Sequence, residues 1–160
     1  ETPMHTWTDF LAYAEGATAA PAAVFIEILA LRKQDGRLES TLPRPSVELI
    51  RNSAILLYLV HIMRDLEKDA KKGPHLLTLP DEVFAPLGLT PSKFAEFAGA
   101  NSAIVDQVRK SIAEYASNFL IPTLGELNAL DEMLMPSEAD ILRGLCVPYI
   151  EKYERFATNI

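Results

Sequence analysis

Residues 46–73 read SVELIRNSAILLYLVHIMRDLEKDAKKG and join a long apolar stretch to a highly charged end. The apolar residues recur at intervals of three and four, which is the spacing of one face of an α-helix. They are Val47, Ile50, Ala54, Leu57, Ile62 and Leu66. Ser46 is suited to cap a helix start, and Gly73-Pro74 would end a helix. The stretch therefore predicts a long helix from Ser46 to about Lys72, with one face in the protein core.

The segments before and after this helix also show the helical period, and no run has the clean alternation typical of a half-buried strand. Residues 7–31 predict one kinked helix or two shorter helices, because Gly16 and Pro21 lie inside the pattern. Residues 32–44 (RKQDGRLESTLPR) are polar and predict a loop.

Prolines separate the predicted elements in the second half of the chain. Residues 73–91 contain four prolines and predict a constrained loop with one short helical turn near residues 81–85. Thr90 and Pro91 predict a capped helix start, from which a helix should run to about Phe119.

The last part of the chain predicts two further helical pieces. Pro122 and Gly125 should break or bend the preceding helix, and a shorter piece should reach about Leu134. Pro136 opens a last helix, which Pro148 should kink. The sequence as a whole predicts an all-α fold in which residues 1–160 form a single segment.

Composition excludes several classes of protein. The chain has 160 residues, 49% of them apolar, and a formal net charge of −7. Such a chain can bury a core and is unlike a disordered one. The acidic balance argues against a general nucleic-acid binder, which needs excess basic charge. The single cysteine, Cys146, excludes an internal disulfide and a cysteine-rich zinc site, and we expect it to be a buried small apolar residue.

Localisation is predicted from what the sequence contains. No targeting peptide is visible, and the apolar runs at residues 17–26 and 54–60 are shorter than the roughly 20 residues of a membrane span. We therefore expect a cytoplasmic protein without a transmembrane segment; contact with a membrane surface and oligomerisation stay open. Because the sequence starts at Glu1 and not at methionine, we expect it to be part of a longer protein.

The charged end of the long helix, residues 64–73 (RDLEKDAKKG), carries the most distinctive chemistry. Asp65 and Asp69 are four residues apart, so on a helix their carboxylates share a face and could hold one divalent cation such as Mg²⁺. Glu67 points about 200° away from Asp65 and is the weaker ligand candidate. Four basic and three acidic side chains lie between residues 64 and 72, a balance that a magnesium-bound phosphate ester would suit.

Three further residues are candidates for binding phosphate. Arg64 can grip phosphate oxygens with two donors, and Lys72 adds a positive charge two turns later. His61 lies one turn before Asp65 and could contact a phosphate or orient that carboxylate. The alternative is that this segment is a solvated helix end, where ion pairs and the helix dipole account for the charges.

The stretch SAILLYLVHIMRDLEKDAKKG (residues 53–73), followed by LTLP, resembles the second aspartate-rich region of squalene and phytoene synthases. That family's pattern is roughly Gln-x-x-Asn-Ile-Leu-Arg-Asp-x-x-Glu-Asp-x-x-x-Gly-Arg, then Tyr-Leu-Pro. The segment WTDFLAYAEGATAAPAAVF (residues 7–25) resembles a family helix with a tyrosine and small residues. The resemblance covers essentially the whole chain and corresponds to the C-terminal half of the family's domain, so it implies an incomplete helical bundle of the isoprenoid synthase type.

Only some positions of the family's pattern have the same residue in this chain. Arg64, Asp65 and Asp69 match the Arg-Asp pair and the closing aspartate. Lys68 stands at the family's glutamate, and Glu67 is one position earlier. The other departures are Tyr58 for glutamine, His61 for asparagine, Pro74 for arginine and Thr78 for tyrosine.

The resemblance implies a prenyltransferase that condenses two prenyl diphosphates head-to-head with the help of Mg²⁺. Farnesyl or geranylgeranyl diphosphate would be the substrate. Asp65 and Asp69, supported by Glu67, would hold the metal, and Arg64, His61 and Lys72 would bind the diphosphate. The departures at Lys68, Pro74 and Thr78 keep a second reading open: a catalytically relaxed relative that serves as an assembly factor or a prenyl-diphosphate binding module.

Overall fold

The long helix predicted from residues 46–73 is the central element of the structure. A computed structural model describes residues 4–158, and 78% of it is helical. The central helix, α3 (Ser46–Lys72), begins and ends where the sequence predicts. Pro45, and not Ser46, is the capping residue, and no side chain accepts a hydrogen bond there. The all-α fold is therefore confirmed, together with the bounds of its main helix.

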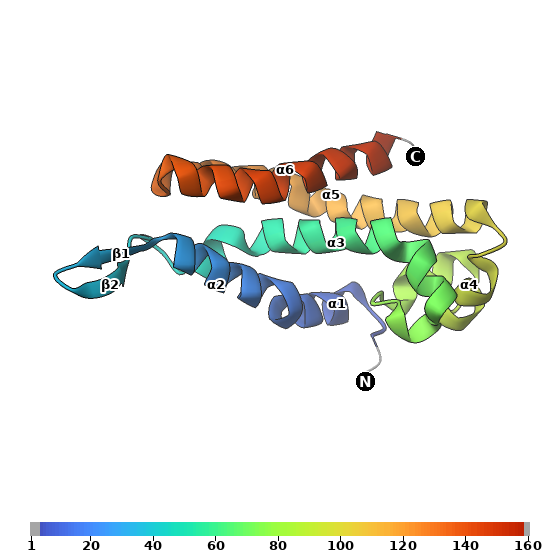
Figure 1. Cartoon of the computed structure of the whole chain (residues 1–160). Coiled ribbons are helices and arrows are strands. Elements are labelled where there is room, and N and C mark those ends of the chain that lie inside the picture. Colours follow the sequence, from blue (N-terminus) through green and yellow to red (C-terminus); the bar gives the residue numbers. More distant parts are fainter. Residues whose placement is uncertain (1–3, 159–160) are drawn as a thin grey trace.

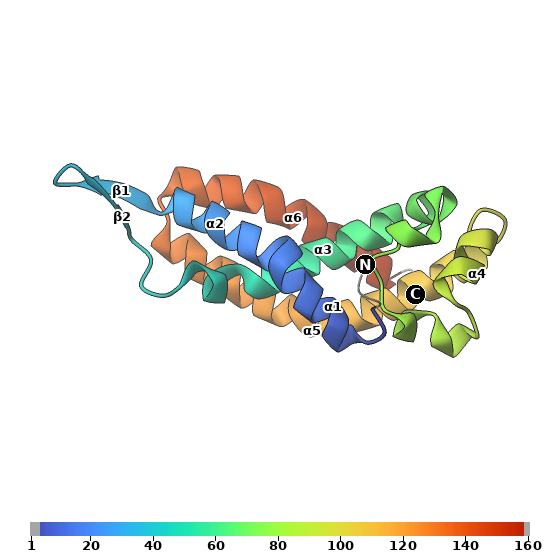
Figure 2. The same cartoon turned by 90° about the horizontal axis from the view of Figure 1, so that it is seen from below.

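The other helices surround α3 on two sides. They are α1 (Trp7–Ala14), α2 (Ala20–Leu29), α4 (Pro91–Phe97), α5 (Ser102–Met133) and α6 (Pro136–Thr158). Figures 1 and 2 show α3 lying between the α1–α2 segment and the α5–α6 pair. In the C-terminal half of α3, His61, Arg64 and Lys68 are exposed, and we call this side of the helix its open side.

Two apolar clusters fill the space around α3. The larger surrounds its C-terminal part and includes the fully buried rings of Phe10, Phe84 and Phe94. The smaller surrounds its N-terminal part and contains Cys146, whose predicted burial is confirmed. Of the predicted core stripe, Val47 is exposed, and Leu57 is half-buried and packs against the smaller cluster.

The α1–α2 segment is continuous through Gly16 and Pro21. A π-helical turn (Glu15–Ala19) joins the two helices, so the predicted interruption is a change of helical pitch. The hydroxyl of Thr18 in this turn donates to the carbonyl of Ala54 at 3.1 Å and so ties the turn to α3.

A β-hairpin replaces the loop predicted for residues 32–44. Strands β1 (Leu31–Gln34) and β2 (Arg37–Ser40) pair antiparallel and project from one end of the bundle (Figure 1). Both turn residues have positive φ, 49° at Asp35 and 84° at Gly36, as a type I′ turn requires. The Asp-Gly pair was the available signal; hydrophobic alternation gave none, because most of the hairpin is exposed.

The predicted helix from residue 90 to 119 is two helices. Thr90 caps α4 as predicted, and its hydroxyl accepts from the Lys93 N–H at 3.3 Å. The chain then turns over residues 98–101, and Asn101 caps α5 through a bond from the Ile104 N–H. Gly99 followed by a capping asparagine was the overlooked signal. Short 3₁₀ turns at Asp81–Val83 and Ala85–Leu87 confirm the helical turn predicted near residues 81–85.

The prolines inside the last two helices do not end them. Helix α5 continues through Pro122 and Gly125 to Met133, so of the predicted break or bend, the break is wrong. Both residues are exposed, and buried neighbours on the opposite face hold the helix against α3. Helix α6 continues through Pro148 and bends in its C-terminal half, as predicted (Figure 1).

Among the described residues, α3 is long and apolar enough to cross a membrane, by length and composition only. Half of its apolar window is buried inside the fold, as in the core helix of a bundle. No uninterrupted apolar run in this helix is long enough to span a membrane, so the sequence did not predict it as a candidate membrane span.

A substitution at Gly125 can test whether α5 is helical at this position. A Cβ at Gly125 meets nothing within 4 Å. Since alanine loses less backbone entropy than glycine in a helix, Gly125→Ala should raise the free energy of unfolding by about 0.5–1 kcal/mol, measured by urea denaturation. Gly36→Ala is the opposite control, because a φ of 84° strains alanine and should lower stability. A destabilising Gly125→Ala would contradict the continuous helix.

Candidate functional site

The C-terminal half of α3 presents most of the predicted site residues on its open side. His61 and Arg64 are exposed, and Asp65 and Asp69 are half-buried on the same side of the helix. The buried residues Ile62, Met63 and Leu66 fix the helix against the core, so the polar side chains are held on the opposite side. The structure thus places four of the predicted residues on one side of α3 and brings three of them, His61, Arg64 and Asp65, into contact.

Asp65 forms a compact polar cluster with Arg64 and His61. The Arg64 guanidinium donates to both Asp65 oxygens, Nε to Oδ1 at 3.1 Å and Nη2 to Oδ2 at 2.7 Å. These bonds hold the pKa of the Asp65 carboxyl at about 2, below its ordinary value of 3.8. Asp65 is therefore an anion at neutral pH, and the neighbouring carboxylate raises the pKa of Arg64.

His61 completes this cluster and has a defined tautomer when neutral. Arg64 Nη2 lies 2.8 Å from His61 Nδ1, and because arginine can only donate, Nδ1 is the acceptor. The ring proton is then on Nε2, which lies 3.4 Å from Asp65 Oδ2. His61 thus lies beside the carboxylate, and its predicted role in orienting Asp65 stays a prediction.

Asp69 lies in different surroundings from Asp65. It lines a pocket of about 110 Å³ between α3 and the following loop. The remaining lining residues are Tyr58, His61, Ile62, Leu66, Leu76, Leu77 and Thr78. Burial raises the pKa of the Tyr58 hydroxyl to about 12, so it stays protonated and can donate a hydrogen bond. His61 lines this pocket and also contacts Asp65, and so connects the two carboxylates.

The structure does not bring Glu67 to the two aspartates. Its carboxylate lies on another side of α3 and accepts from Lys71 Nζ at 2.7 Å, which lowers its pKa. Lys68 and Lys72 are exposed on α3. Glu67 therefore contributes no metal ligand in this conformation, as its direction on the helix already indicated.

The fit of Mg²⁺ depends on what else binds it. Within residues 4–158, no group of three or more His, Cys, Asp and Glu side chains is placed to hold a metal ion. Magnesium commonly binds through one or two carboxylates, with water and substrate phosphate completing its shell. Asp65 and Asp69 fit that mode, in which the substrate supplies ligands, and they do not fit an all-protein cage.

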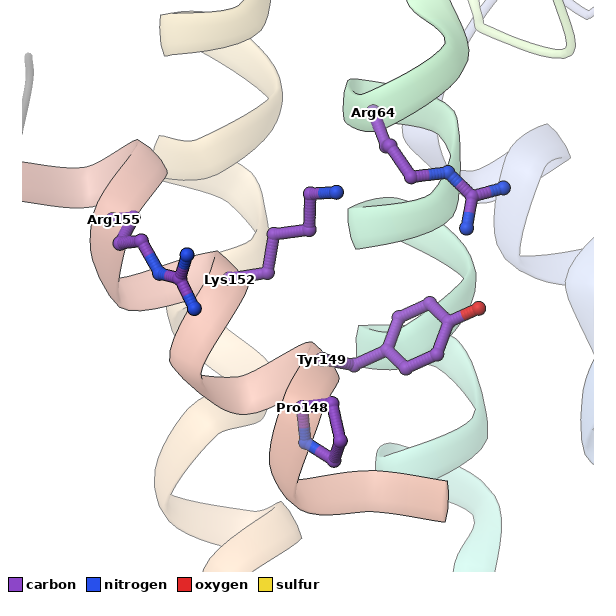
Figure 3. A pocket seen from close by; sticks show the side chains of 5 residues that line it. All are labelled: Arg64, Pro148, Tyr149, Lys152 and Arg155. Carbon is purple, nitrogen blue, oxygen red and sulfur yellow. The ribbon is translucent and has the colours of Figure 1, made fainter. Parts of the chain in front are cut away.

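A second pocket lies between α3 and α6 and was not predicted. It has a volume of about 280 Å³ and is lined by Arg64, Pro148, Tyr149, Lys152 and Arg155 (Figure 3). Sequence reasoning missed it because the α6 residues lie more than 80 positions from Arg64, and one sequence does not reveal how two helices are rotated. The available signal was the spacing of Pro148, Lys152 and Arg155, which places them on one helix face.

Glu126 of α5 is a buried carboxylate that anchors α3. Its Oε1 accepts from the backbone and side-chain N–H groups of Asn52 at 2.9 and 2.6 Å. Its Oε2 accepts from the Ser53 N–H and hydroxyl, both at 2.7 Å. The four hydrogen bonds compensate the carboxylate for its loss of water. Its position on the buried face of α5, four residues before Leu130, was the available signal.

Comparison with known proteins identifies no relative: no family model, curated protein or solved structure matches this chain.

Glu126→Gln should lower the free energy of unfolding by about 2 kcal/mol, because the amide NH₂ would face donors that now bind a carboxylate oxygen. Urea denaturation at neutral pH measures the change. Glu132→Gln, an exposed neighbour on the same helix, is the matched control and should change stability little. Equal effects of the two variants would show that the four bonds do not stabilise the fold.

The Arg64–Asp65 pair should make stability depend on pH in a defined window. Because the Asp65 pKa is lowered on folding, the pair stabilises the protein above about pH 4, and this contribution is lost as the pH falls toward 2. Between pH 6 and pH 2.5, wild type should lose more unfolding free energy than Asp65→Asn, by up to about 1 kcal/mol. Urea denaturation at the two pH values measures this, and an identical pH dependence would contradict it.

Proposed function

We propose that this chain binds the magnesium complex of a prenyl diphosphate and is part of a prenyltransferase of the squalene and phytoene synthase type. The observation that carries the proposal is the open side of α3, where Asp65 and Asp69 share a helix face beside Arg64. Carboxylates for a metal and a guanidinium for phosphate oxygens then act on one ligand. The sequence resemblance supplies the class of reaction, a head-to-head condensation.

Exposed apolar side chains on the helices that flank α3 support an amphiphilic ligand. On α6, Ile141 and Leu145 are four residues apart, and each is 51% exposed. On α2, Val24 and Ile28 have the same spacing and are 60% and 61% exposed. The two helices lie on opposite sides of α3 (Figure 1). The α6 face, which continues to the residues beside Arg64, could contact a prenyl chain whose diphosphate lies at Arg64 and Asp65.

The side chains on α3 would have different roles in binding the diphosphate. When bound, magnesium would neutralise charge on the diphosphate and so favour its departure from the allylic carbon. Arg64 would donate hydrogen bonds to phosphate oxygens from Nη1, while Nε and Nη2 keep their bonds to Asp65. His61, which contacts both residues, could keep Asp65 oriented. The adjoining apolar surface would limit the access of water to the reacting carbon.

A second function is favoured by one observation. Both oxygens of Asp65 are already bound by Arg64, and Lys68 places a positive charge beside them. Because the Asp65 carboxylate is already neutralised by Arg64, it is less available to a metal ion. This suits a protein that binds a prenyl diphosphate without turnover, or an assembly factor that binds none. Cytoplasmic location, contact with a membrane surface and oligomerisation remain predictions of the sequence.

Titration calorimetry with farnesyl diphosphate and Mg²⁺ tests the proposal. Asp65→Asn and Asp69→Asn should each weaken binding by about tenfold or more, because each removes a metal-binding charge. Glu114→Gln, which removes an exposed carboxylate from α5, should bind like wild type.

Product analysis then separates the candidate functions. Release of diphosphate with a condensed prenyl product supports the transferase, and binding without release supports the binding module. Absence of magnesium-dependent binding by wild type, with either farnesyl or geranylgeranyl diphosphate, would reject both and leave the assembly factor.

A further inference from the structure

We propose that the pocket between α3 and α6 is a metal-independent site for a phosphate or diphosphate group. Arg64 of α3 and Tyr149, Lys152 and Arg155 of α6 line it. Its assignment to the diphosphate of a prenyl substrate rests on the proposed function. The anion site itself rests on the pocket and its cations.

The shape of the pocket suits a small polyanion. Its volume is about 280 Å³. At about 30 Å³ for each liquid water molecule, this is the space of roughly nine waters, enough for the two phosphorus and seven oxygen atoms of a diphosphate. Figure 3 shows Lys152 and Arg155 extending from successive turns of α6, with Arg64 across from them on α3.

The charged side chains that line the pocket are all cations. Three of its five lining residues are cations, in a protein whose formal net charge is −7. Asp65 is bound to Arg64, and Glu151 lies 3.8 Å from Arg155, but neither carboxylate lines the pocket. An anion in the pocket would be attracted by the three cationic side chains that line it.

The donor groups match phosphate oxygens. Arginine presents planar pairs of N–H donors that suit phosphate, and lysine adds a point charge. The Tyr149 hydroxyl is turned toward the Arg64 guanidinium in Figure 3 and could donate to the same anion. Arg64 belongs both to this pocket and to the Asp65 cluster, and its Nη1, which binds neither Asp65 nor His61, could donate to an anion in the pocket.

One face of α6 indicates in which direction a ligand would lie in the pocket. Ile141, Leu145, Pro148, Lys152 and Arg155 follow one another at spacings of three and four, so they form one helix face. The face is apolar at its start and cationic at its end. A ligand with an anionic head at Lys152 and an apolar tail toward Leu145 would match both parts, whereas inorganic diphosphate would use the cationic end alone.

Titration calorimetry with inorganic pyrophosphate in EDTA, without Mg²⁺, tests the anion site. Wild type should bind, and Lys152→Gln and Arg155→Gln should each weaken binding by about fivefold or more. Lys152→Arg, which keeps the charge, should retain binding. Lys110→Gln, which removes an exposed charge from α5, is the matched control and should bind like wild type. Circular dichroism confirms that each variant is folded.

The outcomes separate this site from the proposed function. Absence of metal-free binding, or equal weakening by Lys110→Gln, would overturn the anion site. Asp69→Asn should bind metal-free pyrophosphate normally even though its magnesium-dependent binding of prenyl diphosphate is weakened. If pyrophosphate binds through Lys152 and Arg155 while farnesyl diphosphate with Mg²⁺ does not bind, the anion site stands and the proposed function fails. Tighter metal-free binding of farnesyl diphosphate than of pyrophosphate would identify a lipid headgroup as the ligand.

Discussion

The burial of one side of α3 constrains everything else in the structure. From Ile55 to Leu66, its buried side chains occupy an arc of roughly 160° at 100° per residue. Removing these side chains from water drives the packing of α1, α5 and the loop after α3 around them. The polar residues of the same segment are then confined to the remaining side of the helix. Core and candidate site are therefore two faces of a single helix.

Polar contacts from α5 fix how α3 sits on that core. Glu126 binds the backbone of α3 near its start, and Arg109 donates from Nε to the Met63 carbonyl at 3.1 Å, one residue before Arg64. Apolar packing tolerates small sliding motions between helices, whereas directional hydrogen bonds at two distant points resist them. Helix α5 thereby holds the register and rotation of α3, and with them the direction of the Arg64 and Asp65 side chains. The buried Thr123 hydroxyl, which has no hydrogen-bond partner among the described residues, lies one turn before Glu126 in the same helix.

Features that depend on one segment were predictable from the sequence, and features that depend on two were not. The bounds of α3, the cap at Thr90 and the shared face of Asp65 and Asp69 follow from local spacing. The pocket at Lys152 required the rotation of α6 relative to α3, which is set by packing. The continuity of α5 through Pro122 required knowing that the opposite face is buried, because tertiary packing there outweighs the local cost of proline. The hairpin was missed for a different reason. The Asp35-Gly36 pair is a local signal for a tight turn, but the flanking residues show no apolar alternation that would indicate strands.

The hairpin is also attached more firmly than its exposure suggests. Arg32 at its base donates to Glu138 at 2.5 Å, and the same carboxylate oxygen accepts from the Met135 N–H at the start of α6. Thr41 closes the other side of the base by binding the Ala30 carbonyl. A force on the exposed tip would therefore act through Arg32 on the first turn of α6, the helix whose far end carries Lys152 and Arg155. The hairpin is thus mechanically coupled, through the Arg32–Glu138 ion pair, to the helix that contributes Lys152 and Arg155 to the pocket.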